Sequence, residues 1–120
     1  TTSFMPVAKQ RVGVGLICQS GIHFVGPTKF SGMIGKGVDL GNSCDIGFYD
    51  VLNYFAEDPD IQVIAIHMEG LNQGKDFLPL AARVVKEKPI VVHKSGRSET
   101  GAKAAMSHTG SLAGNCFKRP

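Results

Sequence analysis

One histidine near the end of the chain lies among residues that suit phosphoryl chemistry. His108 is embedded in the segment 94–114, which is rich in glycine and hydroxyl side chains. A neutral imidazole offers one nucleophilic nitrogen while its other nitrogen donates a hydrogen bond. Backbone N–H groups at flexible positions such as Gly110 can stabilise the spread negative charge of a phosphoryl group. We therefore predict that His108 accepts a phosphoryl group; the alternative is a glycine-rich turn with a hydrogen-bonded structural histidine.

A second candidate site is the tripeptide Gln19-Ser20-Gly21, which follows the apolar run 12–18. Such a run is typical of a strand buried on both faces of a parallel sheet. Ser20 could cap a helix over 22–30, and a small-residue turn between a strand and a helix is a recurrent anion site. The pattern therefore makes Gln19-Ser20-Gly21 a candidate anion site, with an ordinary β-to-α turn as the alternative.

Composition indicates one globular domain and excludes several classes of partner. The chain has 120 residues, of which 42% are hydrophobic, and its net charge of +3 comes from scattered residues. It has no dense basic stripe interleaved with aromatics, so we expect no nucleic-acid partner. No apolar run has the length of a membrane span and no signal peptide is recognisable, so we expect no membrane partner.

The cysteines indicate a reducing compartment. Cys18, Cys44 and Cys116 are odd in number and form no C-x-x-C pair. Neither a disulfide framework nor a zinc site is therefore implied, and we expect a cytoplasmic protein without a metal site. Because the chain opens on Thr1 rather than on Met, we also expect it to be an excerpt from a longer protein.

Apolar runs alternate with segments of helical spacing along the chain. We predict a lead-in over residues 1–10, a domain over 11–114 and a tail over 115–120. The predicted strands cover 12–18, 33–40, 61–68 and 89–93, and the predicted helices cover 22–30, 45–56, 75–87 and 99–106. This alternation with short connections predicts an α/β fold, an open parallel sheet covered by helices.

In such a sheet ligands bind beyond the carboxyl ends of the strands. Glu69 ends one predicted strand, and His108 lies on the loop after the last one, so we expect both at the same edge. A carboxylate that accepts a hydrogen bond from one ring nitrogen exposes the other for attack. Glu69 is therefore the predicted partner of His108, with a solvated carboxylate as the alternative. His67 and His93 lie within strands and are predicted to be structural, whereas the role of His23 stays open.

Nearly the whole chain resembles the second, flavodoxin-like domain of the NDP-forming acyl-CoA synthetases, relatives of the succinyl-CoA synthetase alpha subunit. The order and spacing of short motifs carry this resemblance. They are Thr2-Ser3-Phe4, Gln19-Ser20-Gly21, Gly41-Asn42-Ser43-Cys44-Asp45, Asp58-Pro59, Glu69-Gly70, Lys88-Pro89, Lys94-Ser95-Gly96-Arg97-Ser98 and the run from Ser107 to Gly114. The resemblance implies a flavodoxin-like three-layer open parallel sheet with helices on both faces, present here as a truncated copy.

The resemblance also implies an activity, that of an acid-thiol ligase. His108 matches the histidine that the family phosphorylates, Glu69 matches the glutamate that orients it, and Ser20 and Gly21 match the helix N-terminus that holds the phosphate. The implied reaction interconverts acyl-CoA, phosphate and ADP with a carboxylic acid, CoA and ATP. An acyl phosphate forms first, and its phosphoryl group passes to His108 and then to the nucleotide.

The implied partners are parts that this chain lacks. Family members add a CoA-binding domain and an ATP-grasp domain or subunit, which would bind CoA, ADP or ATP, and magnesium. We expect no prosthetic group and no metal ligand in this chain, and we expect that it does not complete the cycle alone. A sheet edge left unpaired by truncation favours an oligomer.

Two other functions fit the same resemblance. Some proteins of this architecture use the region as a regulatory module attached to an acetyltransferase, and in those the histidine is typically replaced. The retention of His108 favours the enzyme. A flavodoxin-like module that binds flavin or nucleotide is the third possibility, supported by the fold alone.

Overall fold

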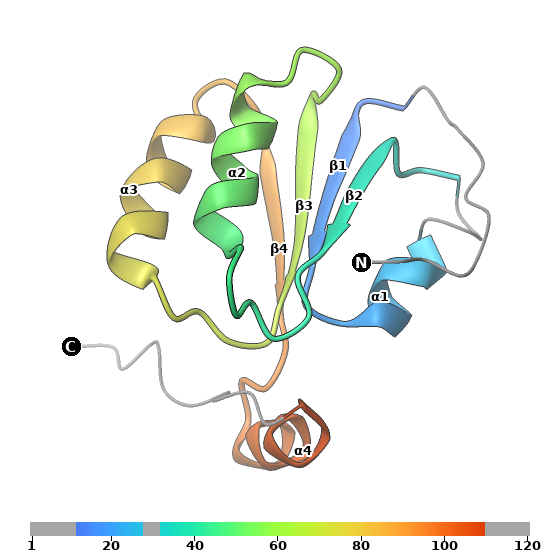
Figure 1. Ribbon diagram of the computed structural model, residues 1–120, viewed down its shortest axis with the longest axis vertical. Coiled ribbons are helices and arrows are strands. Elements are labelled where there is room, and N and C mark those ends of the chain that lie inside the picture. Colours follow the sequence, from blue (N-terminus) through green and yellow to red (C-terminus); the bar gives the residue numbers. More distant parts are fainter. Residues whose placement is uncertain (1–11, 28–31, 110–120) are drawn as a thin grey trace.

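The computed structural model describes residues 12–27 and 32–109, without the side chains of residues 105, 106, 108 and 109. Four parallel strands form one sheet in the order β2-β1-β3-β4 (Figure 1). The strands are β1 (Val14–Cys18), β2 (Lys36–Asp39), β3 (Val63–Met68) and β4 (Ile90–Lys94). The helices are α1 (Gly21–Gly26), α2 (Phe48–Glu57), α3 (Gly74–Val84) and α4 (Glu99–Thr109). The predicted α/β parallel sheet with short connections is confirmed.

Helices cover the two faces of the sheet unequally. Helices α2 and α3 lie together on one face, and α1 lies on the other (Figure 1). The α2/α3 face contains the larger core, whose most completely buried side chains include Ile17, Leu52, Phe55 and Ile64. The sheet is therefore the middle of three layers, as the flavodoxin-like expectation requires.

The strand register decides which face each side chain meets. Along β3, Ile64 and Ile66 belong to the core beneath α2 and α3, whereas Ala65 packs with the smaller cluster on the α1 side. Because successive side chains of a strand point to opposite faces, His67 shares the α1 side with Ala65. His67 is paired in register with His93 of β4 and with Cys18 of β1, which places these residues in one row across the sheet.

Helix α2 begins three residues later than the sequence pattern predicts. The predicted start was Asp45, but the helix begins at Phe48 after Gly47, whose N–H donates to Asp50 Oδ2 at 2.8 Å. Gly47 has an extended backbone, with φ of −112° and ψ of −176°, so the helix cannot include it. Ser43, with a φ of 53°, turns the chain before this cap. The turn before α2 is thus fixed by a cap and a left-handed residue rather than by hydrophobic spacing.

Other boundaries shift by one to three residues where the described residues allow a comparison. Helix α1 ends at Gly26, and part of its predicted continuation to residue 30 lies outside the described residues. Strand β2 occupies 36–39 rather than 33–40, although the N–H groups of Gly35 and Leu40 still donate to β1 carbonyl oxygens at 2.9 and 2.7 Å. Helix α4 extends past its predicted end at 106 to Thr109.

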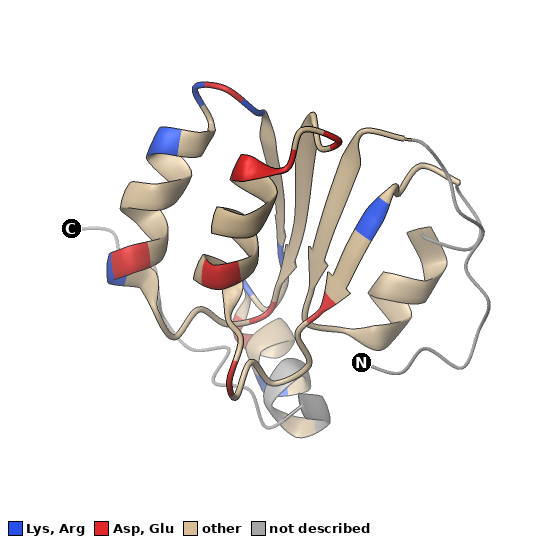
Figure 2. Cartoon of the chain, turned by 45° about the horizontal axis from the view of Figure 1, so that its top comes forward, with Lys and Arg blue, Asp and Glu red and all other residues tan. Residues whose placement is uncertain are grey.

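Charged residues are interspersed over the elements rather than gathered into one basic stripe (Figure 2). Among the described residues, no helix combines the length and apolar character that a membrane crossing needs.

Candidate functional site

The loop after β3 presents Glu69 at the carboxyl edge of the sheet. Gln19, which follows β1, holds this loop through its side-chain carbonyl: Oε1 accepts from the N–H of Glu69 at 2.7 Å and from that of Gly70 at 3.0 Å. Its amide nitrogen lies 3.4 Å from Ser43 Oγ beyond β2. One glutamine therefore joins the ends of three adjacent strands at the carboxyl edge of the sheet.

Lys94, the last residue of β4, fixes the same loop from the other side. Its ammonium donates to the carbonyl oxygen of Glu69 at 2.7 Å and to that of Ser95 at 2.5 Å. Among the described residues, no hydrogen bond or ion pair engages the Glu69 carboxylate itself. The main chain of Glu69 is held on both sides while its half-buried carboxylate is available to a further group.

The turn at Ser20 and Gly21 lies beside this loop at the start of α1. Ser20 has an extended backbone and accepts from the N–H of Phe24 at 2.9 Å, but its side chain makes no capping hydrogen bond to α1. Gly21 is exposed, and Asp39 Oδ2 lies 3.6 Å from the position that a Cβ on Gly21 would take. A carboxylate thus lies near the turn for which phosphate binding is predicted, and an anion there would have to tolerate or displace it.

Cys18 lies under this turn and is inert. Its Sγ donates to the carbonyl oxygen of Ser20 at 3.1 Å and is fully buried. Burial raises the pKa of the Cys18 thiol to about 11, and the carboxylates of Asp39 and Glu69 act in the same direction. Because the thiolate is the nucleophilic form, Cys18 supports the turn rather than reacting.

The segment after β4 leads to α4 through a tight glycine turn. Gly96 has a φ of 70°, which glycine adopts without strain, and Ser98 Oγ accepts from the N–H of Gly101 at 3.0 Å as α4 begins. Helix α4 lies beyond the carboxyl edge of the sheet (Figure 1). This edge is the one at which Glu69 lies.

The backbone of His108 is in the last turn of α4 rather than on a loop, so the prediction of a loop position was wrong. A run of residues with good helix propensity, Ala102 to Met106, explains why the helix continues. The side chain of His108, and Gly110 altogether, lie outside the described residues. The predicted pairing of His108 with Glu69 therefore stays a prediction.

Three histidines meet on the α1 side of the sheet, a cluster that the sequence analysis missed. The ring of His23 from α1 stacks on His67, with centroids 4.0 Å apart and planes at 9°, and the His93 ring centroid is 5.3 Å from that of His67. Within the described part of the chain, no group of His, Cys, Asp and Glu side chains is suited to hold a metal ion. The proximity of His67 and His93 could have been predicted, because they occupy equivalent positions on adjacent strands. The stacking of His23 on His67 could not, because it depends on how α1 packs against the sheet.

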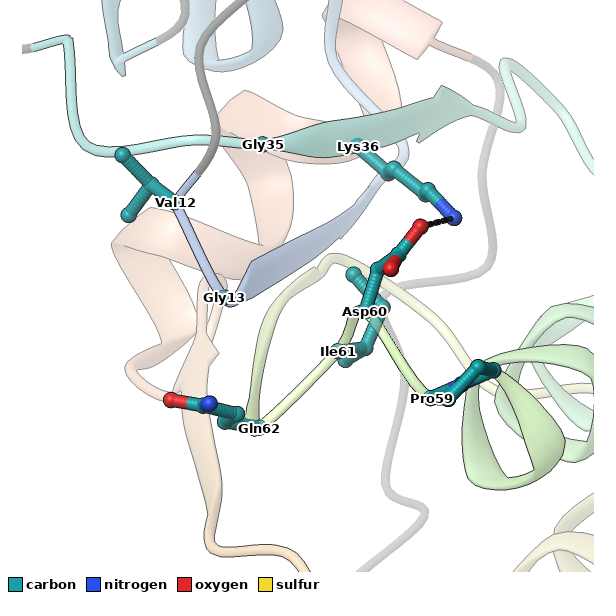
Figure 3. Close-up of a pocket in the computed structure, with 8 residues that line it drawn as sticks. All are labelled: Val12, Gly13, Gly35, Lys36, Pro59, Asp60, Ile61 and Gln62. Carbon is teal, nitrogen blue, oxygen red and sulfur yellow. Dashed lines mark hydrogen bonds and ion pairs between the residues drawn. The ribbon is translucent and has the colours of Figure 1, made fainter.

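The opposite edge of the sheet has an open hollow of a different character. Its lining comes from the segments that enter β1, β2 and β3, and all eight residues are labelled in Figure 3. Lys36 donates there to Asp60 at 2.8 Å and to Asp58 at 2.6 Å. These hydrogen bonds raise the pKa of Lys36 and lower that of Asp58. Since the cation is already paired, this hollow is a structural feature of the amino edge.

Comparison with known proteins agrees with this architecture. The chain is 41% identical over 117 residues to acetate–CoA ligase [ADP-forming] I of Archaeoglobus fulgidus, covering 94% of this chain and 17% of the relative. It is 53% identical over 78 residues to the alpha subunit of acetate–CoA ligase [ADP-forming] I of Pyrococcus furiosus, covering 65% and 17%. The chain thus spans about a sixth of the length of these relatives.

A solved structure has the same fold. It is a dinucleotide forming acetyl-coenzyme A synthetase 1 from Ca. Korarchaeum cryptofilum in complex with phosphate and ADP, with a TM-score of 0.80 and 40% identity. The match covers 88% of this chain and 24% of that one. Residues 11–117 match the family described as succinyl-CoA ligase like flavodoxin domain, and this chain belongs to that family.

Proposed function

We propose that this chain is the phosphohistidine-bearing domain of an NDP-forming acyl-CoA synthetase, an acid-thiol ligase. The protein would interconvert acyl-CoA, phosphate and ADP with a carboxylic acid, CoA and ATP. His108 would be the phosphoryl acceptor and Glu69 its orienting carboxylate, with Ser20, Gly21 and Gly110 contributing to phosphate binding. Relatives whose names state an ADP-forming acetate–CoA ligase support the reaction class.

The fixed main chain of Glu69 is the observation that carries this proposal. Gln19 and Lys94 hold it at the carboxyl edge, and among the described residues its carboxylate has no partner. A free carboxylate on a rigid support is suited to accept a hydrogen bond from an imidazole N–H and to favour the tautomer that attacks phosphorus. Helix α4, which bears His108, lies beyond the same edge (Figure 1).

The proposed cycle has three balanced steps. A phosphate oxygen attacks the thioester carbonyl, the C–S bond breaks, and CoA leaves as the thiol with an acyl phosphate as product. His108 then attacks phosphorus, the P–O bond breaks, and the carboxylate leaves. Finally a terminal oxygen of ADP attacks the phosphoryl group, the N–P bond breaks, and ATP forms with His108 regenerated.

Other domains would complete the site. We assign CoA to a CoA-binding domain, and nucleotide with magnesium to an ATP-grasp domain or subunit. A relative named as an alpha subunit supports a separate partner, and the structural neighbour in complex with phosphate and ADP supports these two ligands. The chain alone would not complete the cycle. The free thiols of Cys18 and Cys44 support a reducing, cytoplasmic setting, and the outer edge of β4 supports an oligomer.

The test uses the full-length protein together with its nucleotide-binding partner. Incubation with radiolabelled ATP and magnesium should yield an acid-labile, base-stable phosphoryl adduct that mass spectrometry assigns to His108. His108→Ala should abolish it, and Glu69→Gln should slow its formation by roughly 100-fold, because the imidazole loses its charged partner.

Glu87→Gln is the matched control. Glu87 is an exposed carboxylate in the turn between α3 and β4, at the opposite edge of the sheet, so its neutralisation should leave the labelling rate unchanged. If nucleotide binds but no adduct forms on the wild-type protein, a regulatory or binding module replaces the enzyme as the function.

A further inference from the structure

The buried ring of His67 connects three segments of the candidate site. Only 5% of this residue is exposed. Its ring stacks on His23 of α1, and its Nε2 lies 3.0 Å from Ser95 Oγ, in the loop that follows β4. His67 itself lies two residues before Glu69. The imidazole of His67 therefore contacts both α1 and the loop after β4, and its own strand leads directly into the Glu69 loop.

The protonation state of His67 follows from its surroundings. Burial lowers the pKa of His67 to about 4, and the nearby His23, His93 and Lys94 act in the same direction. The ring is thus neutral at physiological pH and carries one N–H. Nδ1 is buried with no partner among the described residues. A buried N–H without an acceptor is rarer and costlier than an idle lone pair, so we assign the proton to Nε2, which donates to Ser95 Oγ.

This assignment determines the direction of the Ser95 hydroxyl. The Ser95 N–H donates to the carbonyl oxygen of Met68 at 2.9 Å, and its own carbonyl accepts from Lys94. With its Oγ accepting from His67, the remaining O–H hydrogen must find another acceptor. Among the described residues, Ser95 Oγ makes no hydrogen bond other than that with His67. Ser95 is therefore a rigidly held donor beside Glu69, with an unused O–H.

We propose that His67 is a positioning residue that orients the Ser95 hydroxyl as a hydrogen-bond donor to a phosphoryl oxygen at the carboxyl edge. This inference rests on the proposed function, because the acceptor is the phosphoryl group carried to or from His108. Glu69 accepts a hydrogen bond from the imidazole N–H of His108, whereas Ser95 donates one to the phosphoryl oxygen. The loop after β4 thus contributes to binding the phosphoryl group, while the loop after β3 orients the imidazole that carries this group.

The experiment compares single and double variants in the full-length protein with its partner, using ATP with magnesium, and inorganic phosphate with acetyl-CoA and ADP. Ser95→Ala and His67→Phe should each lower the rate of His108 labelling by about tenfold and raise the KM for phosphate, as expected for one lost hydrogen bond to a charged group. The double variant should be no slower than either single variant. His67→Gln, which keeps a donor, should recover most of the rate.

His93→Phe is the matched control, because His93 belongs to the same cluster but has no hydrogen bond to Ser95 among the described residues. It should label at the wild-type rate. Nitrogen NMR of histidine-labelled protein gives a readout independent of activity: His67 should be the Nε2–H tautomer, and Ser95→Ala should shift the Nε2 resonance most.

The outcomes separate the two proposals. Wild-type labelling with an unchanged rate in Ser95→Ala overturns this inference alone, as does an Nδ1–H tautomer. Effects of the single variants that multiply in the double variant also overturn it. Absence of any labelling in the wild-type protein overturns the proposed function, and this inference with it. If His67→Phe does not fold, Ser95→Ala, His67→Gln and the tautomer still decide.

Discussion

The two faces of the sheet differ in what covers them. Beneath α2 and α3 lies a continuous apolar core, in which Ile17, Leu52 and Phe55 are almost fully buried. On the other side, the buried hydrophobic cluster consists of Leu16, Cys18 and Ile34, and α1 contributes no buried residue. The imidazoles of His67 and His93 lie beside this cluster on the same face. The α2/α3 face supplies most of the apolar burial. The α1 face, here called the thin face, keeps histidine ring nitrogens close to the candidate site.

This division has a physical reason. Apolar burial contributes roughly 25 cal/mol per Å² and needs no orientation, so a single face can supply most of the folding free energy. A site needs side chains that are rigid but still polar, and burying them costs free energy unless partners are present. Because His67 lies on the side of the smaller cluster, the buried polar ring does not interrupt the apolar core that supplies stability.

The largest expected effect comes from truncating equivalent rings on the two faces. Phe55→Ala should lower the free energy of unfolding by about 3–5 kcal/mol, because a fully buried ring leaves a cavity among rigid neighbours. Phe24→Ala, on the half-covered α1, should lower it by only about 1–2 kcal/mol. Urea denaturation followed by circular dichroism measures both. Equal losses would contradict the division between the faces.

The next effect is a pH dependence located on the thin face. His67 has its pKa lowered from 6.5 to about 4, so between these values the unfolded state binds a proton that the folded state does not. Stability should therefore fall as pH decreases from 6.5 to 4 and level off below. The loss from this group should be about 3 kcal/mol.

Comparison with His67→Phe isolates this effect from other titrating groups. The variant should lose less stability than the wild type between pH 7 and pH 4, by that same amount. The carboxylate of Asp58, whose pKa is lowered by Lys36, also destabilises the fold on acidification, but it does so in both proteins. Parallel stability curves would show that His67 is not the neutral buried ring inferred above.

Sequence patterns predicted the strands better than the contacts between their ends. The run Ile64-Ala65-Ile66 predicted β3, because a strand that is apolar on both faces leaves a continuous signal. The same patterns predicted that Glu69 lies at the carboxyl edge of the sheet, because the carboxyl ends of parallel strands share one edge. The hydrogen bond from the Glu69 N–H to Gln19 Oε1 spans 50 residues and leaves no local periodicity, and the start of α2 depends on the extended backbone of Gly47.

The histidine cluster shows the same limit. His67 was predicted to be structural from its position in a strand, and its burial is confirmed. Its stack with His23 depends on how α1 packs across the sheet, which no spacing encodes. The fold could be predicted from repeating patterns, whereas the site depends on single long-range contacts.

Adding one methyl group should give a smaller effect that again depends on the face. A Cβ on Gly15 would lie 2.8 Å from Phe55 Cδ2, so Gly15→Ala should cost about 1–3 kcal/mol by overpacking. At Gly26 in α1 nothing lies within 4 Å of a Cβ, and Gly26→Ala should be neutral or stabilise by up to about 1 kcal/mol. Thermal denaturation of the two variants measures the contrast. A comparable loss at Gly26 would mean that α1 packs more tightly than its exposure indicates.

The smallest effect is a difference in the labelling rates of two cysteines in the folded protein. It requires no change in stability and reports local opening of the face that α1 covers. In a Cys116→Ser background, an aromatic disulfide reagent should label exposed Cys44 within the mixing time at pH 8. Cys18 should react far more slowly, because burial blocks access and its pKa of about 11, against 9.0 ordinarily, reduces the thiolate fraction by roughly 100-fold.

Labelling of Cys18 in increasing urea then reports the free energy of opening of the α1 face. Cys18 should become reactive at lower urea than global unfolding requires, since α1 contributes no buried residue to the fold. If Cys18 is exposed only with the whole domain, the α1 face is as cooperative as the α2/α3 face, and the rigidity attributed to His67 and Ser95 comes from the entire fold.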